Sequence, residues 1–132
     1  MIALGIGCRR EASADEIEAV IVQVLTAARL TADAVAVIAT AAGKMHEPGV
    51  IEAATRLGRP LLGINSDALT AVADLAVTRS DLVHRLMGVP SVAETAALAA
   101  AGRNARLILA RMANASATCA MAEGEGAAED RT

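Results

Sequence analysis

The 132-residue sequence contains no phenylalanine, tyrosine or tryptophan, although 55 % of its residues are hydrophobic. Any core must therefore be built from Ala, Val, Leu, Ile and Met, whose small volumes favour close packing of helices on a sheet. The missing aromatic rings argue against a site for single-stranded nucleic acid, because such sites rely on stacking platforms for the bases. A formal net charge of −3 without a basic run argues in the same way against binding to a duplex.

Cysteine is also scarce, with only Cys8 and Cys119 near the two ends of the chain. They form neither a CxxC motif nor a zinc-ligand pattern, and we interpret them as reduced thiols of a cytosolic protein. No apolar run reaches the ~18 residues of a membrane span, and Met1 leads into an apolar stretch without a charged leader. We therefore expect a cytoplasmic protein with no membrane partner, no protein-bound metal and no cofactor.

Strand-like and helix-like segments alternate along the chain. Ser13 and Glu16 have the spacing of a capping box, and they open a helix with apolar residues on one face that ends near Leu30. The continuous apolar run over 34–39 is typical of a strand buried on both faces. A second helix is predicted over 48–57, because it has a proline at its first turn and a glycine after its end.

The remaining elements follow in the same alternating order. We expect a strand over 61–64, a short helix after Asn65, a helix over 80–87, an alanine-rich helix over 91–101, and strands over 106–110 and 117–122 around a turn at 114–116. This order predicts a three-layer α/β/α single domain over residues 1–122, with a mostly parallel sheet of about five strands and a C-terminal antiparallel hairpin. The small and mostly acidic residues 123–132 predict a disordered tail.

The first sixteen residues place an apolar strand, a glycine turn, two arginines and a helix start in that order. Gly5 and Gly7 let the backbone come close to a ligand, and free N–H groups at a helix start favour negative charge. Arg9 and Arg10 add fork-shaped donors suited to carboxylate or phosphate. This order predicts an anion-binding site, although the two arginines have an alternative role as a solvated pair that balances the acidic residues of the following helix.

Ligands of α/β sheets bind beyond the carboxyl ends of the strands, so the loops that follow the predicted strands should share one rim. These loops lie at 5–10, 40–47 and 65–67. In the second loop, Lys44, His46 and Glu47 have two interpretations. They form an acid–base cluster, or His46 is solvated and Glu47 is simply a favourable charge at a helix N-terminus.

Two nucleotide-binding patterns fail. The position of the third glycine in the dinucleotide fingerprint holds Arg10. The Gly43-Lys44 pair lacks the upstream glycine of a phosphate loop and is followed by Met45, where Ser or Thr is required. The sequence therefore does not indicate either kind of nucleotide site.

Three segments together carry a family resemblance. They are GIGCRR with the helix start after it, Thr40 with Lys44 and the Glu47-Pro48-Gly49 stretch, and the segment GVPSVAE over 88–94. In this order and approximate spacing they resemble the family formed by CobE and the C-terminal domain of CbiG, over residues 1 to about 122. The resemblance implies a role in cobalamin biosynthesis on corrin-ring intermediates. Because the sequence has no counterpart of the N-terminal portion of CbiG, we expect a stand-alone CobE-like protein.

The resemblance also implies a set of ligand-binding residues, carried over by position. They are Gly5, Gly7, Cys8, Arg9 and Arg10 in the first loop, Thr40, Lys44 and Glu47 in the second, and Ser91 and Glu94, which are most simply a helix cap. The final strands of the family often carry lysines, whereas Arg111 is the main basic residue here, so that edge stays outside the predicted site. Corrin precursors carry acetate and propionate groups around a large apolar ring, which fits the predicted anion site.

Three functional hypotheses follow. The leading one is a protein that binds a carboxylate-rich precorrin or corrin intermediate as a carrier or chaperone. The second is an enzyme with a lactone-opening, hydrolase-like step on a precorrin, in which Lys44 polarises a carbonyl and Glu47 or His46 is the base. The third is a non-catalytic subunit that binds another cobalamin-pathway enzyme through its alanine-rich helices. The oligomeric state is left open, with a homodimer as one alternative because two-fold pairing is the commonest assembly.

Overall fold

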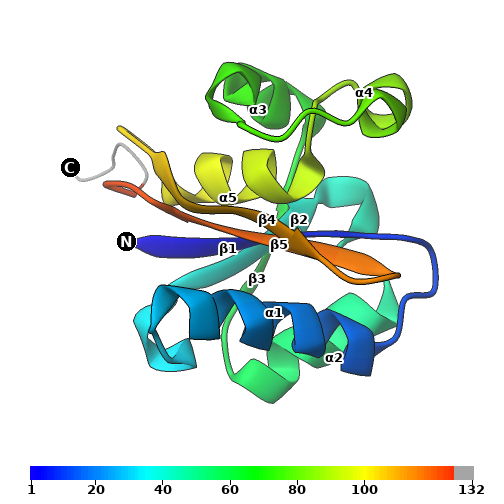
Figure 1. The fold of residues 1–132 in the computed structure, drawn as a ribbon, viewed down its shortest axis with the longest axis vertical. Helices are drawn as coiled ribbons and strands as arrows, with labels where there is room; N and C mark the ends of the chain where they lie inside the picture. Colours follow the sequence, from blue (N-terminus) through cyan, green and yellow to red (C-terminus); the bar gives the residue numbers. More distant parts are fainter. Residues whose placement is uncertain (127–132) are drawn as a thin grey trace.

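The computed structural model describes residues 1–126, without the side chains of residues 82, 84 and 87. Its strands are β1 (Ile2–Cys8), β2 (Val37–Ala41), β3 (Leu61–Ile64), β4 (Arg106–Ala113) and β5 (Ala117–Glu123). Its α-helices are α1 (Ala14–Ala28), α2 (Pro48–Leu57), α3 (Ser66–Ala71), α4 (Asp81–Met87) and α5 (Val92–Ala101), with 3₁₀ turns η1 (Ala32–Ala34), η2 (Ala42–Lys44) and η3 (Ala73–Leu75). Helices α1 and α2 cover one face of the sheet and α5 covers the other, with α3 and α4 further out on that side (Figure 1). The predicted three-layer α/β class is confirmed.

The five strands form one sheet in the order β3-β2-β1-β5-β4. β1 pairs with β2 and β2 with β3 in parallel, whereas β5 is antiparallel to both β1 and β4. Four of the five strands therefore point in the same direction and only β5 points in the opposite one. Because β5 lies between β1 and β4, however, two of the four strand pairings are antiparallel. The expectation of a mostly parallel sheet is thus partly wrong, because the C-terminal hairpin inserts its second strand beside β1.

The second strand begins later than the sequence predicts. The apolar run favours a strand over 34–39, whereas η1 ends at the first residue of that run, Ala34, and β2 extends from Val37 to Ala41. Helix α1 ends at Ala28 with Arg29 as its C-cap residue, whose φ of 59° is left-handed, and the chain makes a further turn before it enters the sheet. Small apolar residues such as alanine carry no signal that separates this turn from the strand.

The structured part of the chain extends beyond Ala122, the predicted end of the domain. Glu123 belongs to β5 and pairs with Ile2. Further on, the N–H of Gly126 donates to the carbonyl of Ala101 at 2.7 Å, and the N–H of Arg103 donates to the carbonyl of Gly126 at 3.1 Å. These contacts correct the predicted boundary of the tail at residues 123–126, and residues 127–132 of that tail lie outside the described residues.

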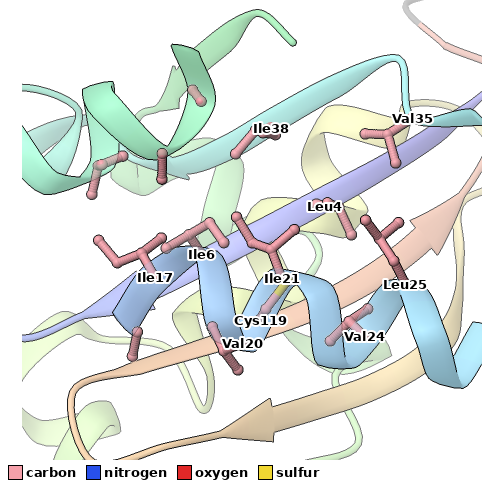
Figure 2. Close-up of a cluster of buried hydrophobic side chains, with 14 of the residues drawn as sticks. Leu4, Ile6, Ile17, Val20, Ile21, Val24, Leu25, Val35, Ile38 and Cys119 are labelled. Atoms are coloured by element: carbon pink, nitrogen blue, oxygen red, sulfur yellow. The ribbon is translucent and has the colours of Figure 1, made fainter. Parts of the chain in front are cut away.

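The two faces of the sheet are packed by side chains of different size. On the α1 side, β1 presents Leu4 and Ile6 to the apolar face of α1, and the large aliphatic side chains gather in one cluster (Figure 2). On the α5 side the buried strand residues are mostly small, as Ala3 and Ala39 illustrate. This difference explains how a core without aromatic residues is filled, because a helix can lie close to the backbone of the sheet where side chains are small.

Candidate functional site

A cavity of about 410 Å³ lies at the carboxyl end of β1. Its lining comes from the end of β1, from η2, α4 and the start of α5, and from the β4–β5 hairpin: Gly7, Cys8, Arg9, Lys44, Val83, Leu86, Val92, Arg111, Asn114, Ala115, Ser116, Ala117 and Thr118. The loop after β1, the hairpin turn and α4 all lie at the same end of the molecule (Figure 1). Segments that are more than a hundred residues apart in the sequence therefore meet around one space.

The lining of this cavity combines basic and apolar side chains. Arg9, Lys44 and Arg111 contribute three basic side chains, and no Asp or Glu is found among the described lining residues. The apolar part consists of Val83, Leu86 and Val92, and the Leu86 side chain is largely exposed to solvent. Such a cavity suits an anion that also carries an apolar surface, because charge-assisted hydrogen bonds and hydrophobic contact can form together.

Gly7 allows the hairpin to approach the end of β1. It pairs with Thr118 of β5, and the Thr118 hydroxyl donates to the Gly7 carbonyl at 3.3 Å. A Cβ on Gly7 would lie only 2.7 Å from the Thr118 Oγ1. The absence of a side chain therefore serves the contact between two strands and leaves the backbone of Gly7 on the cavity wall.

Arg9 is held by the turn of the hairpin. Its guanidinium donates to the carbonyl of Ala115 at 2.7 Å, and its backbone N–H donates to the carbonyl of Ser116 at 3.0 Å. Glu16 of α1 fixes the same turn from the other side, because its carboxylate accepts from the Ser116 hydroxyl at 2.8 Å and its carbonyl accepts from the Asn114 amide at 2.8 Å. The hydrogen bond from Ser116, with those from Ser13, lowers the pKa of Glu16. The cavity rim is thus fastened to the first turn of α1.

Cys8 is half-buried in the cavity wall. Burial raises the pKa of the Cys8 thiol, the charge of Lys44 opposes that shift, and the charge of Glu47 adds to it. Burial likewise raises the pKa of Cys119, which lies in the core. A thiol with a raised pKa is largely protonated near neutral pH and is a poor nucleophile, so Cys8 has the character of a lining residue.

Lys44 and Glu47 both belong to the loop after β2, but they have different surroundings. Lys44 is half-buried and lines the cavity. Glu47 precedes Pro48 as the N-cap residue of α2, and its Oε1 accepts from the N–H of Glu11 at 2.9 Å. Glu11 itself has a left-handed φ of 64°. Glu47 therefore stabilises the bend after β1, and neither it nor the exposed His46 is part of the described lining.

The structure brings four of the predicted site residues to the cavity: Gly7, Cys8, Arg9 and Lys44. It places six elsewhere: Gly5, Arg10, Thr40, Glu47, Ser91 and Glu94. The loop over 65–67, which was expected at the same rim, is also outside the lining, and the Asn65 side chain instead caps α3 by accepting from the N–H of Ala68 at 2.9 Å.

The residues outside the lining have structural partners that account for them. A Cβ on Gly5 would overlap the carbonyl oxygen of Ala93, so Gly5 permits the close contact between β1 and α5. The Thr40 hydroxyl is buried and donates to the carbonyl of Ile6 at 2.7 Å, which joins β2 to β1. Ser91 is buried as the N-cap of α5, where its hydroxyl accepts from the N–H of Glu94 at 3.2 Å. Arg10 differs from these residues, because it is exposed and no hydrogen bond of its side chain is described.

Sequence reasoning predicted the hairpin and a helix over 80–87, but it assigned neither of them to the site. The hairpin contributes Arg111 and the residues of its turn, and α4 contributes Val83 and Leu86. A usable signal was present for Arg111, a charged residue between apolar neighbours in a strand, although its direction depends on pairing that the sequence does not display. For α4 no comparable signal was available, because Val83 and Leu86 look like ordinary helix residues.

Glu94 is a carboxylate with no solvent-exposed surface. Its Oε1 accepts from the N–H groups of Val77 and Thr78, each at 2.9 Å. Its Oε2 accepts from the Thr78 hydroxyl at 2.5 Å and from the N–H of Arg111 at 2.9 Å. Burial alone would raise the pKa of Glu94, but these hydrogen bonds outweigh burial and hold the pKa below its ordinary value.

The lowered pKa of Glu94 predicts that the stability of the protein falls at low pH. A carboxyl group whose pKa is lower in the folded than in the unfolded state stabilises the fold at pH values above its ordinary pKa of 4.5. This contribution is lost as the pH falls through the folded-state pKa. We expect the urea midpoint of the wild-type protein to fall between about pH 5 and pH 3 more steeply than that of Glu94→Gln, which lacks the titrating group. Equal slopes for the two proteins would contradict the assignment.

Neither a metal centre nor a spanning helix is found in the described part of the chain. Among the side chains that the structure describes, no group of three or more His, Cys, Asp or Glu comes together as a metal site. The helices of that part are also too short or too polar to cross a membrane.

Comparison with known protein families and curated sequences gives consistent matches. The family model described as cobalamin synthesis G C-terminus matches residues 2–122. The protein CobE of Sinorhizobium sp is 32 % identical over 121 residues, which are 92 % of this chain and 79 % of that protein. The cobalt-precorrin-5A hydrolase of Priestia megaterium is 30 % identical over 102 residues, which are 77 % of this chain but only 27 % of the hydrolase. This chain thus matches about a quarter of the hydrolase.

Solved structures agree with these matches. The crystal structure of CobE, a protein from the cobalamin biosynthetic pathway, superposes with a TM-score of 0.88 and 32 % identity, covering 96 % of this chain and 92 % of that one. The cobalamin biosynthesis protein chiG from Agrobacterium tumefaciens gives a TM-score of 0.75 and 36 % identity, covering 95 % and 99 %. A cobalamin biosynthesis protein G homolog from Sulfolobus solfataricus gives 0.74 and 26 %, covering 94 % of this chain and 37 % of that one.

Proposed function

This chain belongs to the cobalamin synthesis G C-terminal family and to the cobalamin biosynthetic pathway, and from that premise we propose that it binds a carboxylate-rich precorrin or corrin intermediate. The proposed site is the cavity at the carboxyl end of β1. The proposed role is that of a carrier or chaperone, which holds a labile ring and passes it to another protein of the pathway.

The observation that carries this proposal is the convergence of three cations from three separate segments. Arg9 follows β1, Lys44 follows β2 and Arg111 comes from β4, and no carboxylate lies among the described lining residues. Acetate and propionate groups on a corrin ring would accept hydrogen bonds from these side chains. Each charge-assisted hydrogen bond contributes roughly 1.5–3 kcal/mol, so two or three of them suffice for specific recognition.

The apolar wall and the size of the cavity support the same ligand class. Val83, Leu86 and Val92 offer aliphatic contact to the face of a ring, without aromatic stacking. A cavity of about 410 Å³ is near the lower end of the range for small-molecule pockets. A macrocycle would therefore place one edge in the cavity and leave the rest uncovered, which suits a protein that releases its ligand to a partner.

The geometry favours binding over a lactone-opening reaction. Lys44 lies in the cavity, as a carbonyl-polarising group would. The proposed base Glu47 is outside the described lining and accepts from the Glu11 N–H, and His46 is exposed elsewhere on the loop. The Cys8 thiol, whose pKa is raised by burial, is a weak nucleophile near neutral pH. The two proposed bases therefore have no described place in the cavity lining, which favours binding as the role of Lys44.

The proposal is tested by titrating the protein with hydrogenobyrinic acid, a late corrin intermediate, and with the methyl ester of the same ring. The protein contains no tryptophan or tyrosine, so ring absorbance in its gel-filtration peak reports binding directly. We expect the acid to co-elute and the ester to bind at least about tenfold more weakly, because the ester cannot accept charge-assisted hydrogen bonds. Failure of the acid to bind, or equal binding of the two rings, would contradict the proposal.

The same experiment separates the carrier from its alternatives. Recovery of the ring with unchanged spectrum and mass supports a carrier, whereas a changed mass supports an enzyme. If no ring co-elutes and the protein instead forms a stable complex with another cobalamin-pathway enzyme, the non-catalytic subunit becomes the preferred account.

A further inference from the structure

Arg111 enters the cavity from an irregular part of β4. The pairing of β4 with β5 passes from Leu109↔Met121 to Met112↔Cys119, so β4 contains one residue more than β5 over this interval. Arg111 lies inside this β-bulge and has no register partner on β5. Bulges bend a strand and redirect its side chains, and they are common next to functional sites.

The bulge is fastened by a side chain from another layer of the fold. Glu94 lies in the first turn of α5, and its Oε2 accepts from the backbone N–H of Arg111 at 2.9 Å. The same oxygen accepts from the hydroxyl of Thr78 at 2.5 Å, and the Oε1 accepts from the N–H groups of Val77 and Thr78. One buried carboxylate therefore joins the strand that carries Arg111 to the segment that leads into α4.

A backbone hydrogen bond also joins the two ends of the stretch that contains α4. The N–H of Ser80 donates to the carbonyl of Pro90 at 3.1 Å, which brings together the two ends of the stretch that contains α4. This stretch supplies Val83 and Leu86, the apolar wall of the cavity. The hydrogen bonds of Val77 and Thr78 to Glu94 thus anchor the segment that carries these apolar side chains, and the hydrogen bond of the Arg111 N–H anchors the residue that carries a cationic side chain.

We propose that Glu94 is a positioning residue for the ligand site, which holds Arg111 and the α4 segment, two parts of the cavity lining, in a fixed position relative to each other. The inference rests on the proposed function, because it states how the binding site is kept in shape. A buried carboxylate is costly unless its oxygens are saturated with donors, and here four donors from two segments saturate them. An apolar side chain at this position would avoid that cost but could not join the two segments.

A double-mutant cycle tests whether Glu94 acts through Arg111. Glu94→Gln cannot accept all four hydrogen bonds, and we expect it to weaken the binding of hydrogenobyrinic acid by about tenfold. In an Arg111→Ala background the same change should cost clearly less, because the group that it positions is already absent. In the matched Lys44→Ala background it should keep its full cost. An equal factor in all three backgrounds, or no loss at all, would overturn the proposal.

A measurement without ligand keeps the test independent of ring binding. We expect the backbone amides of Arg111, Val77 and Thr78 to exchange with solvent faster in Glu94→Gln than in the wild type, while the amide of Ile21 in the core of α1 is unchanged. Unchanged exchange at all three amides would overturn the positioning role. If the wild type binds no ring but these amides exchange faster in Glu94→Gln, the proposed function fails, whereas the role of Glu94 in fixing the β-bulge is supported.

A second variant covers the case in which Glu94→Gln does not fold. Thr78→Val removes one hydroxyl donor to the Oε2 and leaves the bond from Arg111 in place. Since this variant loosens only the α4 segment, its loss of ring affinity should persist in the Arg111→Ala background. Full affinity in Thr78→Val would overturn the part of the proposal that concerns α4.

Discussion

Replacing Gly5 by alanine is expected to destabilise the protein by about 3 kcal/mol or to prevent its folding. The added Cβ would overlap the carbonyl oxygen of Ala93 and lie 2.6 Å from the backbone nitrogen of Ala97. Both atoms belong to the backbone of α5, so no side chain can move aside and the whole helix must shift. Urea unfolding followed by far-ultraviolet circular dichroism measures the loss.

Gly43→Ala is the matched control for this prediction. A Cβ on Gly43 has no heavy atom within 4 Å, and we expect a change in the free energy of unfolding of no more than about 0.5 kcal/mol. If Gly5→Ala were as stable as Gly43→Ala, the close packing of α5 on β1 would be wrong. A misfolded Gly5→Ala protein beside a folded Gly43→Ala protein would confirm that the fold requires glycine at position 5.

Arg111→Ala is expected to weaken the binding of hydrogenobyrinic acid by roughly 10- to 100-fold, while Arg106→Ala leaves it nearly unchanged. Both arginines lie on β4, so the two variants remove the same charge from the same strand. Arg111 lines the cavity, whereas Arg106 is exposed and paired with Glu123 at 2.6 Å, outside the lining. The comparison therefore separates a specific contact from the effect of net charge.

Isothermal titration with each purified variant measures this difference. The loss in Arg111→Ala should shrink when the methyl ester replaces the acid, since the ester offers no carboxylate to the guanidinium. Equal losses in the two variants would indicate a general electrostatic effect, and an unaffected Arg111→Ala protein would remove the hairpin from the binding site.

The helices on the α1 side could be predicted because their signals are local. The capping box of Ser13 and Glu16 is present as expected, with the N–H of Glu16 donating to the Ser13 hydroxyl at 3.1 Å. Helix α2 begins at Pro48 and stops at Gly58, whose φ of 68° is left-handed. Each of these signals depends on residues within one turn of the helix end, so the rest of the fold does not alter it.

The binding site could be predicted only in part, because half of it depends on pairing between distant strands. Arg9 was found from the local order of strand, glycine turn and helix start. The hairpin lies beside Arg9 because β5 pairs with β1, with Cys8 opposite Ala117. No local sequence pattern predicts that pairing. The direction of Arg111 further depends on a β-bulge in β4 that only the register reveals.

Gly5 and Thr40 show a different limit of the sequence. A glycine in a strand indicates that something approaches the backbone closely, but not whether a ligand or a helix does so. Here α5 is the partner of Gly5, and the alanine-rich sequence of that helix was the available signal. Similarly, the hydroxyl of Thr40 fits a ligand or a neighbouring strand, and the structure uses it to bind β1.

The central claim, that the cavity between the end of β1, α4 and the β4–β5 hairpin holds a carboxylate-bearing ring, is tested most directly by mapping amide resonances during a titration with hydrogenobyrinic acid. We predict that the shifts concentrate on Gly7, Cys8, Arg9, Lys44, Arg111 and the hairpin turn, and that the far edge strand β3 (Leu61–Ile64) is unaffected. Shifts centred on β3 or on the loop over 65–67, with the hairpin unchanged, would contradict the account.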